Sequence, residues 1–296
     1  MSKEGPILFV RGGALGDFVL TMPVLASCFA TGRPVHVACA SRHLPLVRAC
    51  GTPERFWDID GAESLWMFGG ADPVGFADAV VFAEGRAGLP VARCHWVNAR
   101  PPAGVPAWAH FASVLPGYFP AVDPRLVLGA QRLRPDRPIV LAPGASDARR
   151  SWALSRWLAL RDRLAETHPV VLVGGPLETW ADYRPGLEEL CGLAASAGAW
   201  LGPDSGPSHL ASRFGAPTLV VFPTDDHTWA PAGATVLAWG VEEGEVVEIL
   251  RAEAPLTQGA AGARGSRPGA LRQHAVTGPC THPPHSSSTT SNLPKS

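Results

Sequence analysis

Short apolar runs alternate with longer segments of helical periodicity in the first part of the chain. The first run, Ile7–Arg11, leads into a glycine-rich turn and then into an apolar, mostly helical segment that reaches Ala30. Apolar runs of about 4 to 8 residues bounded by turn residues are typical of buried strands. Pro23 lies within the helical segment, so we expect that helix either to kink or to begin at Thr21–Pro23. The pattern then predicts strands at Val35–Ala40, Phe56–Asp60 and Ala79–Phe82, and helices at Leu44–Cys50 and His110–Leu115.

The same alternation restarts after a segment from Gly117 to Pro138, which is rich in proline, arginine and aspartate and has little periodicity. We interpret this segment as the connection between two domains. Beyond it the pattern predicts strands at Ile139–Ala142, Val170–Val173, Ala199–Leu201, Thr218–Phe222 and Val236–Trp239. It predicts helices at Ser155–Thr167, Leu187–Ala197, from Pro207 onward, and at Glu242–Arg251.

Strands that alternate with helices in both halves predict two doubly wound, Rossmann-like α/β domains that face each other. We place these domains at residues 1–132 and 133–252. Residues 253–296 contain no aromatic residue and end in a serine- and threonine-rich run. Because this segment can bury little apolar surface, we predict that it is disordered. Ligands of such folds bind at the carboxyl ends of the strands, so we expect the site in the cleft between the domains.

Composition and charge exclude several classes of protein. The net charge is −1, from 25 basic and 26 acidic residues, which gives no support to a nucleic-acid partner or an anionic membrane as main partner. The chain begins without a signal-peptide pattern and has no uncharged apolar run of about 18 residues. We therefore expect a cytoplasmic protein with at most peripheral contact at the inner face of the cytoplasmic membrane. The six cysteines are scattered without a C-x-x-C pair, which indicates reduced thiols and no zinc site.

The most informative stretch is Leu201–Gly215, where a predicted strand ends, a tight turn follows and a helix begins. Pro207 suits the first helical position, and Ser205 or Gly206 suits the N-cap. His209 then falls in the first turn, where backbone amides, a hydroxyl and an imidazole can together bind a phosphate or another anion. The alternative is a well-capped helix without a ligand. The D-S-G sequence also occurs in serine proteases, but a helix follows at once in α/β surroundings, so we reject that reading.

The glycine-rich turn after the first strand is the second candidate site. Gly12, Gly13 and Gly16 precede Asp17, whose carboxylate either only stabilises a helix start or acts as a general base toward a substrate hydroxyl. A strand, a glycine-rich turn and a helix also open nicotinamide-binding units. The G-x-G-x-x-G spacing is absent and no acidic residue ends the next strand, which argues against an oxidoreductase.

Two further loops carry candidate residues at predicted strand ends. Ser146 and Arg150 offer a hydroxyl and a guanidinium group that suit a diphosphate. Glu178, which follows a G-G-P turn, can accept hydrogen bonds from ribose hydroxyls. The alternative for each is a solvated polar loop. The loop after the predicted strand Thr218–Phe222 contains Asp225, Asp226 and His227. These residues could approach a nucleotide or an acceptor, but we interpret the loop as solvent-exposed surface.

Four of these segments together resemble glycosyltransferase family 9, the ADP-heptose:lipopolysaccharide heptosyltransferases. The matching segments are ILFVRGGALGDFVLTMPVL (7–25), LAPGASDARRSWALSRWLAL (141–160), VVLVGGPLE (170–178) and LGPDSGPSHLASRFGAPTLVVFPTDDHTWAP (201–231). The resemblance covers about residues 6–250, with little contribution from 45–135. It implies a GT-B fold, in which donor and acceptor meet between two Rossmann-like domains. It also implies the transfer of heptose from ADP-heptose with inversion and without a metal.

The resemblance implies a role for each matched residue. Asp17 would be the general base that deprotonates the acceptor hydroxyl, and the acceptor-side loop would be formed by Gly12, Gly13 and Gly16. Ser146 and Arg150 would hold the donor diphosphate, with arginine where the family usually has lysine. Glu178 would contact the adenosine ribose. The residues around the phosphates and the transferred sugar would be Asp204, Ser205, Gly206 and His209.

No metal ligand and no cofactor besides the ADP-sugar co-substrate is implied. We expect a nucleotide-diphospho-sugar donor, a glycan or glycolipid acceptor such as the lipopolysaccharide core, and no nucleic acid. Between Glu178 and Asp204 the chain has room for one helix and one strand fewer than family members, which predicts a smaller second sheet. Pro223 also stands where the family has glycine. These departures keep a second hypothesis open, a non-catalytic nucleotide-sugar-binding protein of the same fold.

Overall fold

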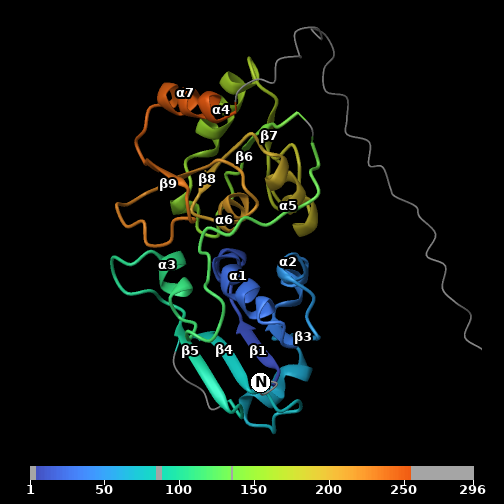
Figure 1. Cartoon of the computed structure of the whole chain (residues 1–296). Helices are drawn as coiled ribbons and strands as arrows, with labels where there is room; N and C mark the ends of the chain where they lie inside the picture. The colour runs from blue at the N-terminus through green and yellow to red at the C-terminus, as the bar shows by residue number, and fades with distance from the viewer. Residues whose placement is uncertain (1–4, 85–88, 135, 255–296) are drawn as a thin grey trace, which may run out of the picture. The chain divides into compact units, whose positions relative to one another are not determined.

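The computed structural model describes residues 5–84, 89–134 and 136–254, and Figure 1 traces their helices and strands. They form two five-stranded sheets in which every strand pair is parallel. Both sheets belong to one compact unit. The predicted fold class is therefore confirmed. The predicted boundary between residues 132 and 133 lies in the connection between the sheets and stays a prediction.

The first sheet and its helices come from the N-terminal half. Its strands are β1 (Ile7–Arg11), β2 (Val35–Cys39), β3 (Arg55–Asp58), β4 (Asp78–Ala83) and β5 (Arg93–Asn98). Its helices are α1 (Leu15–Ala30), α2 (Leu44–Cys50) and α3 (Ala107–Ala112), with 3-10 segments η1 (Ser41–His43) and η2 (Ala62–Phe68). Because side chains alternate along a strand, Ile7 and Phe9 join the core beneath α1, while Leu8 and Val10 join a smaller core on the opposite face.

The second sheet comes from the C-terminal half. Its strands are β6 (Ile139–Leu141), β7 (Val170–Leu172), β8 (Ala199–Pro203), β9 (Thr218–Phe222) and β10 (Thr235–Ala238). Its helices are α4 (Leu154–Ala165), α5 (Leu187–Ser196), α6 (Gly206–Arg213) and α7 (Glu243–Glu253), with a 3-10 turn η3 (Ala148–Arg150).

The two sheets differ in strand order, and each has a topological switch point. The first has the Rossmann order β3-β2-β1-β4-β5, so its switch point, where the strand order reverses, lies between β1 and β4. The second has the order β10-β9-β8-β6-β7, which is the flavodoxin-like arrangement, with its switch point between β6 and β8. Between β7 and β8 the described chain forms one α-helix, α5. The second sheet has five strands, as many as the first, so the smaller second sheet that the sequence predicts stays a prediction. Switch points are where open α/β sheets bind ligands.

The structure changes the bounds of one predicted helix, adds one strand, and excludes the later of the two starts considered for the first helix. The helix predicted at His110–Leu115 is α3, which begins three residues earlier because Ala107 N donates to the carbonyl of Thr228 from a distant loop, 2.7 Å away. The edge strand β5 was not predicted, since Arg93 and His95 interrupt its apolar pattern. Helix α1 begins at Leu15 and carries Pro23 in its interior. The predicted disordered tail lies outside the described residues from 255 onward.

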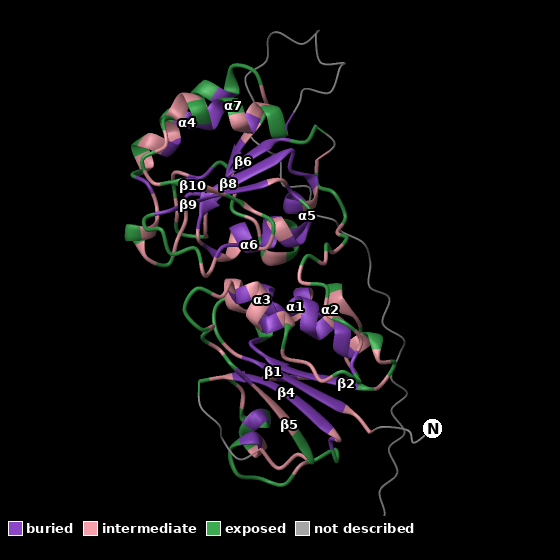
Figure 2. Cartoon of the chain, turned by 60° about the vertical axis from the view of Figure 1, so that its left-hand side comes forward, coloured by how far each residue is buried: buried purple, intermediate pink, exposed green. Residues whose placement is uncertain are grey.

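The main hydrophobic core lies between the two sheets. Figure 2 shows α1, α2 and α3 beside α5 and α6 in this layer, with buried faces turned toward one another. The core includes Phe18 and Leu25 of α1, Trp200 of β8 and Leu210 of α6. A second core, under α4 and α7, covers the other face of the second sheet. Continuous burial between the halves fixes the strand ends that face each other.

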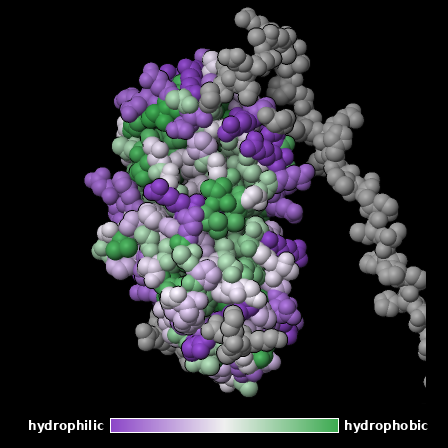
Figure 3. All heavy atoms as spheres, viewed as in Figure 1, coloured by the Kyte–Doolittle hydropathy of each residue, from purple (hydrophilic) through white to green (hydrophobic). Residues whose placement is uncertain are grey.

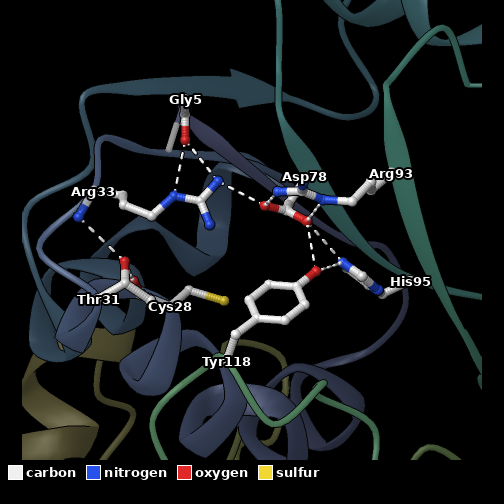
Figure 4. A network of polar contacts seen from close by, with 8 residues as sticks. All are labelled: Gly5, Cys28, Thr31, Arg33, Asp78, Arg93, His95 and Tyr118. Carbon is white, nitrogen blue, oxygen red and sulfur yellow. Dashed lines mark hydrogen bonds and ion pairs between the residues drawn. The ribbon is translucent and has the colours of Figure 1, made fainter. Parts of the chain in front are cut away.

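A buried carboxylate, Asp78, lies at the amino ends of the strands of the first sheet, opposite the carboxyl ends. Figure 4 shows the polar side chains around it. Asp78 begins β4 and is fully buried. Its oxygens accept hydrogen bonds from Arg33 (2.7 Å), Arg93 (2.8 and 2.9 Å) and Tyr118 (2.9 Å), and one lies 2.9 Å from His95 Nε2. Burial on its own would raise the pKa of Asp78, but the hydrogen bonds from these four side chains hold it well below its ordinary value.

The surface mixes polar and apolar residues. In Figure 3 a small patch of hydrophobic residues lies between hydrophilic ones near the middle of the view. Within the described ranges no helix is both long and apolar enough to cross a bilayer. Five of the six cysteines lie in these ranges and are free thiols, while Cys280 lies outside them.

Candidate functional site

A cavity of about 700 Å³ opens where the carboxyl ends of β6, β7 and β8 meet the start of α1. Its volume is in the range of small-molecule sites. The sequence predicted seven donor-side residues, and all of them line this cavity: Ser146, Arg150, Glu178, Asp204, Ser205, Gly206 and His209. Asp17 and Gly16 line the same cavity from the other half of the chain. The tertiary structure thus brings together residues from four separate loops.

Asp17 is the third residue of α1 and serves the helix as well as the cavity. Its Oδ2 accepts a hydrogen bond from Ala14 N at 3.0 Å, and its Oδ1 lies 3.2 Å from Arg11 Nη2. The side chain is still 34% exposed. Gly13 permits this turn, because it has a φ of +97° and a Cβ there would lie 2.9 Å from Asp17 Oδ2. The carboxylate therefore caps the helix and is also exposed to the cavity.

Asp204 contacts both Arg150 and His209 in the cavity. Its Oδ2 lies 3.2 Å from Arg150 Nη1, and its Oδ1 lies 3.3 Å from His209 Nε2. Arg150 also donates to the hydroxyl of Ser146, and its side chain is 36% exposed. Ser205 is the N-cap of α6, as the sequence suggested, although its hydroxyl makes no capping hydrogen bond. The guanidinium of Arg150, the imidazole of His209 and the N-terminus of α6 all line the same cavity. This combination suits an anionic diphosphate.

Glu178 folds back over the glycine turn that follows β7. Its Oε2 accepts a hydrogen bond from Gly175 N. A Cβ on Gly144 would lie 3.2 Å from the same oxygen, so a side chain there would have to displace the carboxylate slightly. Apolar side chains complete this end of the cavity, including Val173 and Leu190. A carboxylate beside an apolar wall can bind the hydroxyls of a ribose while its base packs on the wall.

Two glycines let α1 and α6 approach closely at the cavity. A Cβ on Gly16 would lie 3.1 Å from Cδ2 of His209, and a Cβ on Gly206 would lie 2.8 Å from Cβ of Leu15. Gly16 directly precedes Asp17 in the chain. The backbone next to the candidate base Asp17 is therefore in contact with His209, a candidate donor-binding residue.

A second cavity of about 560 Å³ adjoins the first at Asp17 and Trp229, which line both. Its other walls include Gly12 and Gly13 and the ion pair between Glu84 and Arg100, whose atoms are 2.7 Å apart. It lies at the carboxyl ends of β1 and β4, the switch point of the first sheet. Of the three predicted acceptor-side glycines, Gly12 and Gly13 thus line the second cavity and not the donor cavity. Asp17 lies where the two cavities meet.

The sequence analysis missed Arg11 and Trp229. Arg11 is the single charged residue at the end of an apolar strand, and that position was the available signal. Trp229 lies in the loop that we interpreted as surface. Asp225, Asp226 and His227 of that loop are indeed exposed, but Trp229 reaches both cavities. No pattern in the sequence indicates that contact, because it depends on how the loop packs beside α3.

No group of three or more histidine, cysteine or acidic side chains in the described ranges is arranged to hold a metal ion.

Comparison with known proteins identifies the sequence pattern of the C-terminal part. Residues 184–254 match the model of glycosyltransferase family 9 (heptosyltransferase). This segment contains α6 and the turn with Asp204 and His209. No curated protein sequence matches the chain.

Solved structures extend the likeness to most of the chain. A glycosyl transferase family 9 structure from Veillonella parvula has a TM-score of 0.65 at 12% identity and covers 86% of this chain and 98% of its own. ADP-heptose lps heptosyltransferase II of E. coli has a TM-score of 0.63 at 15% identity, covering 84% and 98%. E. coli heptosyltransferase WaaC with ADP has a TM-score of 0.60 at 15% identity, covering 84% and 100%.

A more distant structural neighbour is described as a metal-containing protein. TibC of enterotoxigenic E. coli is described as an iron-containing dodecameric glycosyltransferase, with a TM-score of 0.51 at 13% identity, covering 79% of this chain and 63% of its own. Together these comparisons support a glycosyltransferase. Residues 184–254 carry the sequence pattern of glycosyltransferase family 9, and the chain has the fold of solved structures from that family.

Proposed function

We propose that the protein is an inverting, metal-independent glycosyltransferase that moves a heptose from ADP-heptose to a lipopolysaccharide-core sugar or a related glycan. The observation that carries this proposal is the single cavity lined by Asp17 and by the seven donor-side residues. A nucleotide-sugar donor fits this lining, because ribose, diphosphate and sugar each meet a group of suitable chemistry. WaaC, a structural neighbour, is described with ADP bound.

The donor would lie with its ribose near Glu178 and its diphosphate between Arg150 and the N-terminus of α6. Arg150 and His209 would then neutralise the charge that develops on the departing diphosphate. This is the role that a metal ion plays in other phosphate-releasing enzymes. The proposed independence of metal rests on these protein groups.

The transfer is a single displacement at the anomeric carbon. Asp17 accepts the proton of the acceptor hydroxyl while the hydroxyl oxygen forms the new glycosidic bond. The bond between the anomeric carbon and the diphosphate oxygen breaks, and ADP leaves with its electron pair. One in-line displacement inverts the configuration of that carbon. The acceptor would reach Asp17 from the second cavity, past Gly12 and Gly13.

Turnover of ADP-heptose with a panel of glycan acceptors, including Kdo–lipid A, tests the proposal. We expect release of ADP and a glycosylated product, and we expect UDP- and GDP-sugars to react poorly. An Asp17→Asn variant should lose about 10²- to 10⁴-fold in kcat and keep its affinity for ADP. Asp162→Asn is the matched control, because Asp162 is an exposed carboxylate on α4 that lines neither cavity. Unchanged turnover in the Asp17→Asn variant would remove Asp17 from its role.

Two further measurements distinguish the proposed metal-independent enzyme from a metal-dependent enzyme and from a non-catalytic binding protein. Activity that disappears with EDTA and returns with a divalent or iron ion would contradict the proposed independence of metal. ADP binding in calorimetry without turnover of any sugar would favour the non-catalytic nucleotide-sugar-binding protein. The short segment between Glu178 and Asp204, which has room for only one helix before the next strand, is the feature that keeps this second candidate open.

A further inference from the structure

Arg11 is a buried cation that contacts the proposed base and lines the second cavity but not the donor cavity. It ends β1, and its side chain is only 5% exposed. Burial lowers the pKa of Arg11, and the neighbouring Asp17 raises it in part. An arginine is expensive to bury, so such a residue needs partners that fix it in place.

Two phenylalanine rings fix the guanidinium from the apolar side. Its central carbon lies 5.7 Å from the ring centre of Phe82 and 5.6 Å from that of Phe111. Phe82 belongs to β4 and Phe111 to α3, so the clamp is built from three different elements. Cation–π contacts of this kind hold a guanidinium plane in a defined place.

The polar side of the same group faces Asp17. Arg11 Nη2 lies 3.2 Å from Oδ1, and Arg11 Nε donates to the main-chain carbonyl of Asp17 at 3.3 Å. The other carboxylate oxygen accepts from Ala14 N. Each oxygen therefore has one partner and keeps a further lone pair for a substrate hydroxyl. Two-point contact with the side chain and the main chain of one residue fixes direction as well as charge.

We propose that Arg11 is a positioning residue, held between Phe82 and Phe111, that keeps the Asp17 carboxylate directed at the junction of the two cavities. This inference rests on the proposed function. It extends that function because it assigns the orientation of the base to a residue that does not itself contact the donor cavity.

A double-mutant cycle on kcat tests the inference. Arg11→Met should lower kcat by about 10- to 100-fold, as expected for a misdirected catalytic group, and change the Kd for ADP by less than about threefold. Arg11→Lys should recover part of the loss, because it restores the charge without the two-point contact. In an Asp17→Asn background, Arg11→Met should cause no further loss, since residues that act as a unit are not additive.

Arg156→Met is the matched structural control. Arg156 also packs on an aromatic ring, at 3.7 Å from the ring centre of Trp152, but it contacts neither cavity. We expect it to lower the melting temperature and leave kcat within about twofold. An equal loss for Arg11→Met with and without Asp17 would overturn the inference, as would unchanged kcat or loss of ADP affinity in parallel with kcat. If the unmodified chain turns over no donor, the proposed function fails and the inference about Arg11 fails with it.

Discussion

Gly16 and His209 are in contact across the two halves of the chain, so closely that a Cβ on Gly16 would lie 3.1 Å from Cδ2 of the imidazole. Gly16 precedes the proposed base, and His209 belongs to the proposed diphosphate site. The spacing between the two groups that must act on one sugar is thus set by a helix crossing at which Gly16 and Gly206 contribute no side chain.

Adding a methyl group at this crossing should affect turnover more than ADP binding. We expect Gly16→Ala to displace the His209 ring by a few tenths of an ångström and to lower kcat about tenfold, because small misplacements at a reacting centre are costly. Gly206→Ala meets Cβ of Leu15 at 2.8 Å, which is less able to move, and should lower the free energy of unfolding by about 1–3 kcal/mol. Steady-state kinetics and chemical denaturation measure these effects.

Gly244→Ala controls for the substitution itself. A Cβ at Gly244 meets no described atom within 4 Å, and the residue lies in the first turns of α7. It should leave kcat unchanged and leave stability equal or higher by up to about 1 kcal/mol. Equal kinetics for Gly16→Ala and Gly244→Ala would show that the crossing does not set the geometry of the site.

Two adjacent arginines should differ sharply in donor binding. Arg150 lines the cavity and pairs with Asp204, whereas Arg149 is 90% exposed and pairs with Asp147. Arg150→Ala should weaken ADP binding about 10- to 100-fold, because a charge-assisted hydrogen bond contributes about 1.5–3 kcal/mol. Arg149→Ala should change it by less than about twofold. Calorimetric titration with ADP measures both, and equal effects would refute the assigned diphosphate position.

Stability should fall in mild acid because of His43. This imidazole is buried, packs on Phe18 with a ring separation of 4.8 Å, and has no hydrogen-bond partner for either nitrogen in the described structure. Burial, with a smaller effect of Arg42, lowers the pKa of His43 to about 4. The unfolded chain therefore binds a proton first, and the free energy of unfolding should drop by up to about 3 kcal/mol as pH falls from about 6.5 to about 4.

The His43→Phe substitution should reduce the dependence of the free energy of unfolding on pH, while it keeps the ring contact with Phe18. Burial also lowers the pKa of His36, so some slope should remain in the variant. Urea denaturation at a series of pH values measures the difference. An unchanged slope in His43→Phe would mean that the imidazole does not stay neutral in the folded protein.

The Asp78 network should contribute strongly to stability at neutral pH. Because the pKa of Asp78 is held below its ordinary value of about 4, its contribution is present above pH 4 and is lost as pH falls through the lower folded value. Asp78→Asn should lower the free energy of unfolding by about 3–5 kcal/mol at pH 7 and by less in acid. Denaturation of this variant beside Asp162→Asn, an exposed carboxylate, checks the effect. A loss that is equal at pH 7 and pH 3 would contradict the ionised state.

The candidate site was largely predictable because its chemistry lies in contiguous turns. Each of the strands β1, β6, β7 and β8 is followed directly by a loop with glycine, hydroxyl or charged residues, and parallel strands bring such loops to one edge. The flavodoxin-like order of the second sheet was not predictable in the same way. Strand order depends on which crossover connections cover each face of the sheet, and the sequence pattern indicates only the order of the strands along the chain.

The residues that were missed depend on long-range packing. Trp229 reaches both cavities because its loop packs beside α3, where Thr228 accepts from Ala107 N. Edge strand β5 escaped prediction because its polar residues Arg93 and His95 are explained only by Asp78 on the neighbouring strand.

The hydrophobic pattern by itself determined the alternation of strands and helices, the two parallel sheets and the loops that carry the candidate residues, because strand and helix periodicity are local properties of the chain. Only the tertiary structure decided that Arg11 is clamped beside Asp17, and that α1 and α6 meet at two glycines. These contacts join residues far apart in the sequence, and they form only when the two sheets bury a common core.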